Sequence, residues 1–409
     1  MPKTERLYYD DSHLIEFEAK VTDISERVSG WTAVSLDRTA FYPTGGGQPS
    51  DTGTLDGSRV VEVIDDEQAG IWHVLQGRAP GVGATVRGRV DWLRRLDHMQ
   101  QHTGQHILSQ AFVTLYNAPT HSFRVLDQSC QIDVALSHPT AELIERAVEL
   151  ANNVVWEDRE VRVLQVTPEQ AAKLPLRKDP VRHGELRLIE IADFDLTPCG
   201  GTHAQRTGEV GMIAVRSWER ARGMTRIDWV AGMRALADYR RANQSARAVA
   251  ALFSSGREDT PSLVQKVLDE NRELQRRGRL LEDLAAKTEA QELLAGSQTL
   301  GQSPARLVMQ IFADRDAESL RRLALALAAH SESVALLASK DQETARLVFA
   351  RSADAPGDMN DLMREACALL EGRGGGKPDL AQGGGKNIAQ LEHAVEMARQ
   401  RLVESLSEG

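Results

Sequence analysis

The chain has 409 residues, of which 41% are hydrophobic and 26% charged, and its formal net charge is −10. This length predicts two or three domains, and no stretch is apolar for long enough to cross a bilayer. The N-terminus lacks the pattern of a secretory signal, and only three widely spaced cysteines occur, so we expect a cytoplasmic protein without disulfides. The acidic total argues against a uniformly basic nucleic-acid surface, although a local basic segment can coexist with it.

Residues 1–93 predict a small β-barrel, because short strand-like runs alternate with clusters of Gly, Asp and Ser. From Arg94 the apolar residues follow a helical spacing instead, and further strand and helix patterns continue to about residue 232. We therefore expect a second domain of mixed helices and strands over residues 94–232.

Residues 233–296 are rich in Ala, Leu, Arg and Glu, which predicts a helical linker. Apolar residues recur there every three or four positions, interrupted by Asn271 and Gly278. We favour a long helix or a short helical hairpin over an intermolecular coiled coil, since the apolar seam is short and broken. Residues 297–409 predict a small α/β domain, so the expected fold class of the whole chain is α+β.

Three histidines stand four residues apart in the predicted helix "DHMQQHTGQHILSQAF": His98, His102 and His106. A helix repeats about every 3.6 residues, so the three side chains are expected on one face. His102 and His106 form an H-x-x-x-H pair that can share one metal ion. The glutamate of the H-E-x-x-H motif is missing, which excludes the metalloprotease interpretation.

A second motif, "CGGTH", lies about a hundred residues downstream and contains Cys199 and His203. One thiolate and three imidazoles form a donor set that suits Zn²⁺ in tetrahedral coordination. We expect the two glycines to permit a tight turn that directs both side chains inward. The sequence therefore predicts a zinc site made by His102, His106, Cys199 and His203, with either three or all four of them bound.

The motifs "HTGQHIL" and "CGGTH" resemble the two zinc motifs of the alanyl-tRNA synthetase editing domain and of its freestanding AlaX relatives. The block "TAFYPTGGGQPSDTG", residues 39–53, resembles the glycine-rich motif of their N-terminal barrel. "GRGGGKPDLAQGGG", residues 372–385, resembles a motif of the C-terminal domain of alanyl-tRNA synthetase. The barrel-like block begins almost at Met1 and leaves no room for aminoacylation motifs, so we expect the long, freestanding AlaX type.

This resemblance implies a zinc-dependent hydrolase that removes a wrong amino acid from alanine tRNA. Ser-tRNA(Ala) is the expected substrate and Gly-tRNA(Ala) the second candidate, with the tRNA acceptor end as partner. Within the matched motifs, the expected catalytic residues are Thr44, Gln48 and His102. The expected substrate-binding residues are Gly45, Gly46, Gly47 and Ser122. Thr44 is equally explained as a turn residue that bonds its own backbone, and Gln48 either bonds the ribose or orients a water.

The C-terminal motif is expected to be a flexible, cationic loop that follows a phosphate backbone through Arg373, Lys377 and Lys386; the alternative is a long mobile hairpin. The resemblance also implies a homodimer through this domain. Two rival functions remain: a tRNA-binding protein with a structural zinc, and an unrelated zinc hydrolase that acts on a small ester. His98 lies outside the family motif, and packing, a bond behind the ligands or a proton-shuttle role are all open.

Overall fold

The computed structural model describes residues 4–26, 31–66, 70–179, 185–300 and 303–407. The chain divides into two compact units, Met1–Ala251 and Leu252–Gly409. Both units mix helices with β-sheets, in agreement with the predicted class. Among the described helices, none combines the length and the apolar character that a membrane span requires.

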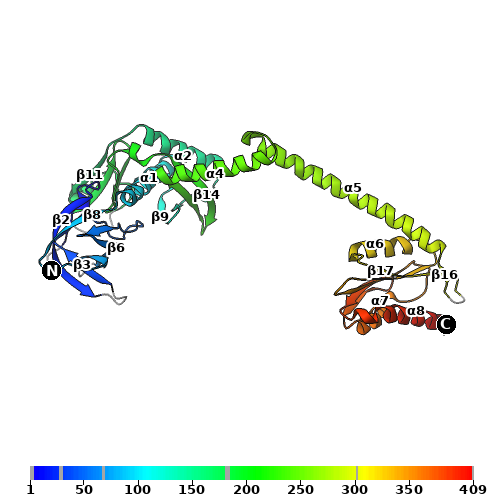
Figure 1. Cartoon of the computed structure of the whole chain (residues 1–409). Helices are drawn as coiled ribbons and strands as arrows, with labels where there is room; N and C mark the ends of the chain where they lie inside the picture. Colours follow the sequence, from blue (N-terminus) through cyan, green and yellow to red (C-terminus); the bar gives the residue numbers. More distant parts are fainter. Residues whose placement is uncertain (1–3, 27–30, 67–69, 180–184, 301–302, 408–409) are drawn as a thin grey trace. The chain divides into compact units, whose positions relative to one another are not determined.

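The first unit begins with a closed barrel in the strand order β2-β3-β7-β6-β5-β8 (Figure 1). Its strands are β2 (Glu16–Glu26), β3 (Thr32–Leu36), β5 (Gly53–Leu55), β6 (Ser58–Asp66), β7 (Gly70–Gln76) and β8 (Thr85–Val90). In β8, buried and exposed residues alternate strictly, as expected for a strand with one face turned to a core. Phe17, Leu36 and Phe41 are among the side chains that fill that core.

Two short elements precede and support the barrel. The strand β1 (Glu5–Arg6) pairs in parallel with β4 (Arg38–Thr39), and the single turn η1 (Leu7–Tyr9) follows β1. Tyr8 of this turn is fully buried in the barrel core. The N-terminal segment is thereby fixed against the barrel.

The helix α1 (Trp92–Tyr116) follows β8 directly and is buried along most of its length. Two antiparallel sheets complete this part of the unit. The four-stranded sheet has the order β14-β15-β10-β9, and the three-stranded sheet has the order β11-β12-β13. The strands are β9 (Thr120–Val125), β10 (Cys130–Val134), β11 (Val161–Val166), β12 (Leu186–Ile191), β13 (Asp195–Pro198), β14 (Ile213–Ala221) and β15 (Met224–Ala231).

A glycine lets α1 approach the four-stranded sheet closely. A Cβ atom at Gly104 would lie 3.1 Å from the Trp229 ring of β15. Ile107 and Phe112 of α1 enter the same hydrophobic core as α2 (Ala141–Trp156). The short elements α3 (Pro168–Ala171) and η2 (Thr207–Val210) connect the strands.

The predicted helical linker is two helices. The helix α4 (Gly232–Leu252) ends before the turn η3 (Arg257–Asp259), and α5 (Thr260–Ala295) begins with a proline in its first turn. Within the second unit, the last part of α5 packs on α6 (Ala317–Ala328), where its small residues are buried. Ahead of that contact, exposed ion pairs such as Lys266–Glu270 and Arg277–Glu273 support the helix at one-turn spacing.

The second unit is built on a six-stranded sheet in the order β16-β17-β18-β19-β21-β20. The strands are β16 (Gln298–Thr299), β17 (Arg306–Ala313), β18 (Ser333–Lys340), β19 (Ala345–Arg351), β20 (Arg373–Lys377) and β21 (Leu380–Gly385). Only the pair β17–β18 is parallel. The helices α7 (Met359–Leu369) and α8 (Leu391–Ser407) share a hydrophobic core with the central strands, with η4 (Ile388–Gln390) leading into α8.

The glycine-rich C-terminal motif is a hairpin, the alternative that the sequence left open, and not the loop that we favoured. It forms the hairpin β20–β21, in which Gly374 pairs with Gly383. A Cβ atom at Gly374 would lie 2.6 Å from the Cys367 Sγ atom of α7, and one at Gly383 would lie 2.5 Å from it. The glycines are therefore needed because the hairpin lies directly against the helix.

Candidate metal centre and its cleft

The four predicted metal ligands come together in the first unit. The ligand atoms of His102, His106, Cys199 and His203 all lie within 4.8 Å of one another. The three histidines are buried, and Cys199 is half-buried. Residues separated by about a hundred positions in the sequence therefore form one compact donor cluster.

Two elements supply these donors. His102 and His106 lie one turn apart on α1, with ring centroids 5.5 Å apart. Cys199 and His203 follow the end of β13, where Pro198 is the last strand residue. The Cys199 sulfur lies 3.3 Å from His102 Nε2 and 3.4 Å from His203 Nε2.

An oxygen atom lies behind each histidine ring. His102 Nδ1 is 2.7 Å from Gln48 Oε1, and His106 Nδ1 is 3.1 Å from Asp195 Oδ2. The His203 Nδ1 atom has a longer contact, 3.4 Å, with the Thr103 hydroxyl. Such contacts fix the ring orientation and leave the other ring nitrogen for an ion.

Asp195 is the only acidic residue among these partners. Its side chain is fully buried and is 2.7 Å from the Arg177 guanidinium as well as next to His106. Burial would raise the pKa of this carboxyl, but hydrogen bonds from His106 and Arg177 outweigh it and hold the pKa far below the usual value. The Asp195 carboxylate next to His106 is therefore charged near pH 7. The sequence analysis identified neither Asp195 nor Arg177.

The electrostatics differ between the donors: burial would lower the pKa of His106, but its hydrogen bonds with Asp195 and Cys199 raise it above the usual value. Burial alone would raise the pKa of the Cys199 thiol, but the neighbouring His102 and His203 rings hold it well below its usual value. Burial lowers the pKa of His203 to about 3, so that ring is neutral near pH 7. A thiolate with neutral imidazoles is a fitting ligand set for Zn²⁺.

Gly201, the second glycine of "CGGTH", is needed because a side chain would not fit there, and not because of its backbone angles. A Cβ atom at Gly201 would lie 2.2 Å from the His102 ring. Neither Gly200 nor Gly201 has a positive φ angle. We predicted that both glycines permit a tight turn. At Gly201, the glycine is needed instead because the backbone lies directly against the His102 ring.

The turn "TGGGQ" joins the barrel to the metal cluster. Gly45 and Gln48 exchange two backbone hydrogen bonds, of 3.0 and 2.9 Å. Gly47 has a φ of +82°, and a Cβ atom there would lie 2.4 Å from the Phe123 carbonyl oxygen. Val125 N also donates to the Gly47 carbonyl oxygen at 2.8 Å. The turn is therefore packed against β9.

Gln48 has a role that the sequence did not predict. Its side chain is buried, with Oε1 next to His102 and Nε2 donating to the Thr202 hydroxyl at 2.8 Å. Because both ends of the amide bond to the protein, the side chain orients a metal ligand. The amide nitrogen has two donors and only one is used here, so the expected contact with ribose or water stays a prediction.

A cleft of about 770 Å³ opens beside the cluster. His102 and Cys199 lie on its wall together with Gly45, which is half-buried, and the exposed Thr44 and Gly46. The Thr44 Oγ1 atom accepts a hydrogen bond from Ser50 N at 3.1 Å, as the turn-residue alternative predicts, but it still borders the cleft. Gly47 is not among the residues that line it.

Ser122 is not brought to this cleft. It lies on β9, where its hydroxyl donates to Asp133 Oδ2 at 2.7 Å, and Asp133 in turn pairs with Arg226. The next residue, Phe123, has its ring 5.4 Å from the His102 ring. Successive residues of a strand face opposite sides, which explains why Phe123 and not Ser122 meets the metal cluster.

His98 also lies apart from the four-residue cluster, although it precedes His102 by one turn. It is 2% exposed, and its Nδ1 atom has no hydrogen-bond partner in the described structure. Burial lowers the pKa of His98 to about 4, so the ring is neutral near pH 7. A proton shuttle that works near neutral pH therefore has no support here.

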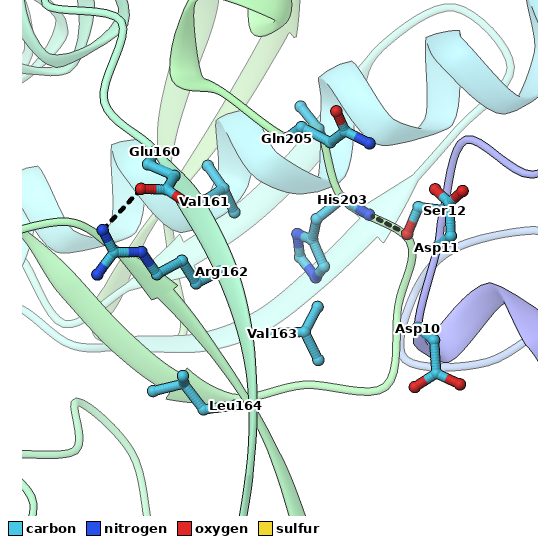
Figure 2. A pocket seen from close by; sticks show the side chains of 11 residues that line it. Asp10, Asp11, Ser12, Glu160, Val161, Arg162, Val163, Leu164, His203 and Gln205 are labelled. Carbon is cyan, nitrogen blue, oxygen red and sulfur yellow. Dashed lines mark hydrogen bonds and ion pairs between the residues drawn. The ribbon is translucent and has the colours of Figure 1, made fainter.

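A smaller hollow, of about 360 Å³, is lined by His203 (Figure 2). Ser12 Oγ accepts a hydrogen bond from His203 N at 3.2 Å, which ties the N-terminal segment to the "CGGTH" motif. Val161 and Val163 of β11 line the same hollow. Three members of the cluster therefore line hollows: His102 and Cys199 the larger one, and His203 the smaller one. Asp10 borders both hollows.

The predicted RNA-binding residues lie in the second unit. Arg373 and Lys377 are the exposed ends of β20, and the exposed Lys386 follows β21. The hairpin holds all three near one edge of the six-stranded sheet, where β20 is the last strand.

Three family models match the chain. They are tRNA synthetases class II (A) over residues 2–94, the Threonyl and Alanyl tRNA synthetase second additional domain over residues 186–228, and the DHHA1 domain over residues 305–404. The second of these includes Cys199 and His203. The matches place the chain among proteins related to alanyl-tRNA synthetase.

Relatives of known name cover nearly the whole chain. The alanyl-tRNA editing protein AlaX-L of Pyrococcus horikoshii is 31% identical over 97% of this chain and 98% of its own length. This chain therefore belongs to the AlaX-L family. Alanine–tRNA ligases of Methanoregula boonei and Pyrobaculum calidifontis are each 32% identical over 99% and 97% of the chain, which spans 44% of their length.

A solved structure matches part of the chain. The C-Ala domain of Aquifex aeolicus alanyl-tRNA synthetase is 29% identical over 26% of this chain and 97% of that domain, with a TM-score of 0.25.

Proposed function

We propose that this protein is a trans-editing hydrolase that deacylates mischarged alanine tRNA at a zinc site. The observation that carries the proposal is the position of the donor cluster: His102 and Cys199 line the same cleft as Thr44 and the glycine turn. Membership of the AlaX-L family supports the same reaction, because the relative from Pyrococcus horikoshii is named an alanyl-tRNA editing protein. Ser-tRNA(Ala) is the proposed substrate, and Gly-tRNA(Ala) the second.

The preference for serine follows from the limits of a hydrophobic pocket. A pocket shaped for alanine rejects an isostere with one added hydroxyl by only roughly a hundredfold. A second site that bonds the hydroxyl supplies the missing discrimination. Thr44 is suited to that task, since its hydroxyl lies at the cleft and accepts only one backbone hydrogen bond.

The chain's own residues hold and shape this site. A zinc ion held by His102, His106, Cys199 and His203 would supply a Lewis acid that polarises the ester or a bound water. Gln48 and Asp195 hold His102 and His106 in place from behind. The bare backbone at Gly45 and Gly46 leaves room beside the ligands for the ester.

The second candidate function is tRNA binding with a purely structural zinc. One observation favours it: four donor atoms lie within 4.8 Å of one another, which is compatible with a closed, four-ligand site. A catalytic zinc keeps one position open for water or substrate. The two functions therefore differ in whether all four side chains bind at once.

Deacylation assays with purified zinc-loaded protein distinguish these functions. We expect hydrolysis of Ser-tRNA(Ala) and no hydrolysis of Ala-tRNA(Ala). Intact Ser-tRNA(Ala) with zinc still bound would support the binding protein. Cleavage of small esters without tRNA would support an unrelated esterase.

The variant Cys199→Ala should lose both zinc and activity, because it removes the one thiolate of the cluster. The matched control is Cys367→Ala, which removes a buried thiol in the second unit, outside the cluster. It should keep full zinc content. Activity retained by metal-free Cys199→Ala protein would refute the zinc-dependent reaction.

We further propose that the hairpin β20–β21 contacts tRNA through Arg373, Lys377 and Lys386, and that the second unit forms a homodimer. The exposed positions of the three cations support the RNA contact. Light scattering after size-exclusion chromatography tests the dimer, with a mass near the 45.0 kDa of one chain as the contradicting result.

A further inference from the structure

Arg187 holds the segment that carries Cys199 from two sides. Its carbonyl oxygen accepts a hydrogen bond from Cys199 N at 3.1 Å. Its side-chain Nη1 donates to the carbonyl oxygens of Cys199 and Gly201, at 2.7 and 3.1 Å. The backbone on either side of Gly200 is thus fixed by one residue of β12.

The same side chain reaches the N-terminal segment. Arg187 Nε donates to the Tyr9 carbonyl oxygen at 3.1 Å, and the guanidinium carbon lies 5.1 Å from the centre of the Tyr9 ring. This arrangement combines hydrogen bonding with a cation–π contact. It connects the metal-ligand turn to η1, which is packed against the barrel.

The charge of Arg187 has no carboxylate partner among the described residues. Two other arginines of the first unit with largely buried side chains do have one: Arg95 pairs with Asp51 at 2.5 Å, and Arg177 with Asp195 at 2.7 Å. Among the described residues, the buried Arg187 Nη2 atom has no hydrogen-bond partner. A buried charge without a counter-ion is costly, so its retention calls for a nearby negative group.

We propose that Arg187 is a positioning residue of the metal centre: it holds the Cys199–Gly201 turn in the ligating geometry and balances the negative charge of the Cys199 thiolate. This role rests on the proposed metal site. The side chain's bonded donors all end on main-chain carbonyl oxygens, which orients the ligand segment, and the residue also lines the cleft beside the cluster. Groups that orient metal ligands from behind typically contribute 10–100-fold to metal affinity.

The test measures the zinc dissociation constant of the full-length protein by competition with a chromophoric chelator. Arg187→Met should weaken zinc binding about 10–100-fold, because both the carbonyl contacts and the charge are lost. Arg187→Lys keeps the charge but cannot bond Tyr9 and both turn carbonyls at once, so we expect an intermediate loss. The matched control is Arg162→Met on the neighbouring strand β11, a half-exposed arginine paired with Glu160, which should bind zinc as the wild type does.

Zinc affinity within twofold of the wild type in folded Arg187→Met or Arg187→Lys would overturn the proposal. Circular dichroism identifies folded variants, and Arg187→Lys decides the question if Arg187→Met does not fold. A higher KM for Ser-tRNA(Ala) with unchanged zinc affinity would also overturn it, because Arg187 would then contact substrate. The two proposals can fail separately, because zinc affinity is measured without tRNA. A wild-type protein that does not deacylate Ser-tRNA(Ala) would refute the proposed reaction, but the zinc measurement would still test the role of Arg187.

Discussion

The two glycine-rich segments, 44–48 and 372–385, look alike in sequence but differ in what their glycines touch. In the first, Gly47 packs against the carbonyl of Phe123 and the turn ends at Gln48, which holds a metal ligand. In the second, Gly374 and Gly383 pack against Cys367 of α7, a residue of the second unit. Both segments show that consecutive glycines can serve close packing between elements instead of flexibility.

The largest effect is expected from Gly47→Ala. The added Cβ would meet a backbone carbonyl that cannot move alone, and φ is unfavourable for alanine, so we expect a loss of about 3 kcal/mol in unfolding free energy. Deacylation should fall at least tenfold, since Gln48 shifts with the turn. The control is Gly45→Ala, whose Cβ would meet only ordinary contacts. Equal stability of the two variants in urea unfolding would contradict the packing role.

Replacing the residue that ends the first turn should have the next largest effect. Gln48→Leu leaves the buried His102 Nδ1 without an acceptor, at a cost of about 1–3 kcal/mol. Zinc affinity should fall about 10–100-fold. The control is Gln110→Leu on α1, where the amide bonds only the exposed Thr114. Unchanged zinc affinity in Gln48→Leu would show that the amide does not orient the ligand.

In the second segment, Gly374→Ala should destabilise only the second unit, by about 1–3 kcal/mol, because the new methyl group overlaps Cys367 Sγ. The double variant Gly374→Ala/Cys367→Ala should recover part of that loss, since the sulfur is gone. Thermal unfolding measures both, and zinc content should stay unchanged. Gly278→Ala on α5, where a Cβ meets nothing, is the control. A fall in zinc content would mean that the two segments are not independent.

The smallest effect concerns the cations that flank the hairpin. Lys377→Gln and Lys386→Gln should leave stability unchanged, because both side chains are exposed. Each should reduce the slope of log affinity for tRNA against log salt concentration by about one. Filter binding at several salt concentrations measures this slope, with Lys266→Gln on α5 as a control. Slopes identical to that of the wild type would exclude a phosphate contact by this hairpin.

The sequence predicted which four side chains come together in the donor cluster, because their residue types are unusual and their spacing is local. His102 and His106 are one helical turn apart, and Cys199 and His203 belong to one short motif. The groups behind them were harder to find, because Asp195, Arg177 and Arg187 are common residue types whose partners are distant in sequence. Gln48 was selected, but only the folded chain shows that it faces His102.

Other predictions failed for local geometric reasons. Ser122 and Phe123 are neighbours on β9, and without the register of that strand the sequence cannot show which of them meets the His102 ring. The C-terminal motif has a composition typical of a loop. Its glycines form a hairpin that packs closely on α7 at Cys367. In both cases, the deciding contact joins elements that no local pattern connects.

The oxygen atoms behind the three histidines come from three different parts of the first unit: the barrel turn, β13 and α1. Metal binding is therefore coupled to assembly, because a ligand held from behind by another element is not in place until that element has docked. Zinc would bind only after the barrel has docked on the rest of the unit, and bound zinc would stabilise the docked state. The barrel and the domain that follows it would therefore depend on each other for a complete site, because Gln48 of the barrel turn lies against His102 of α1.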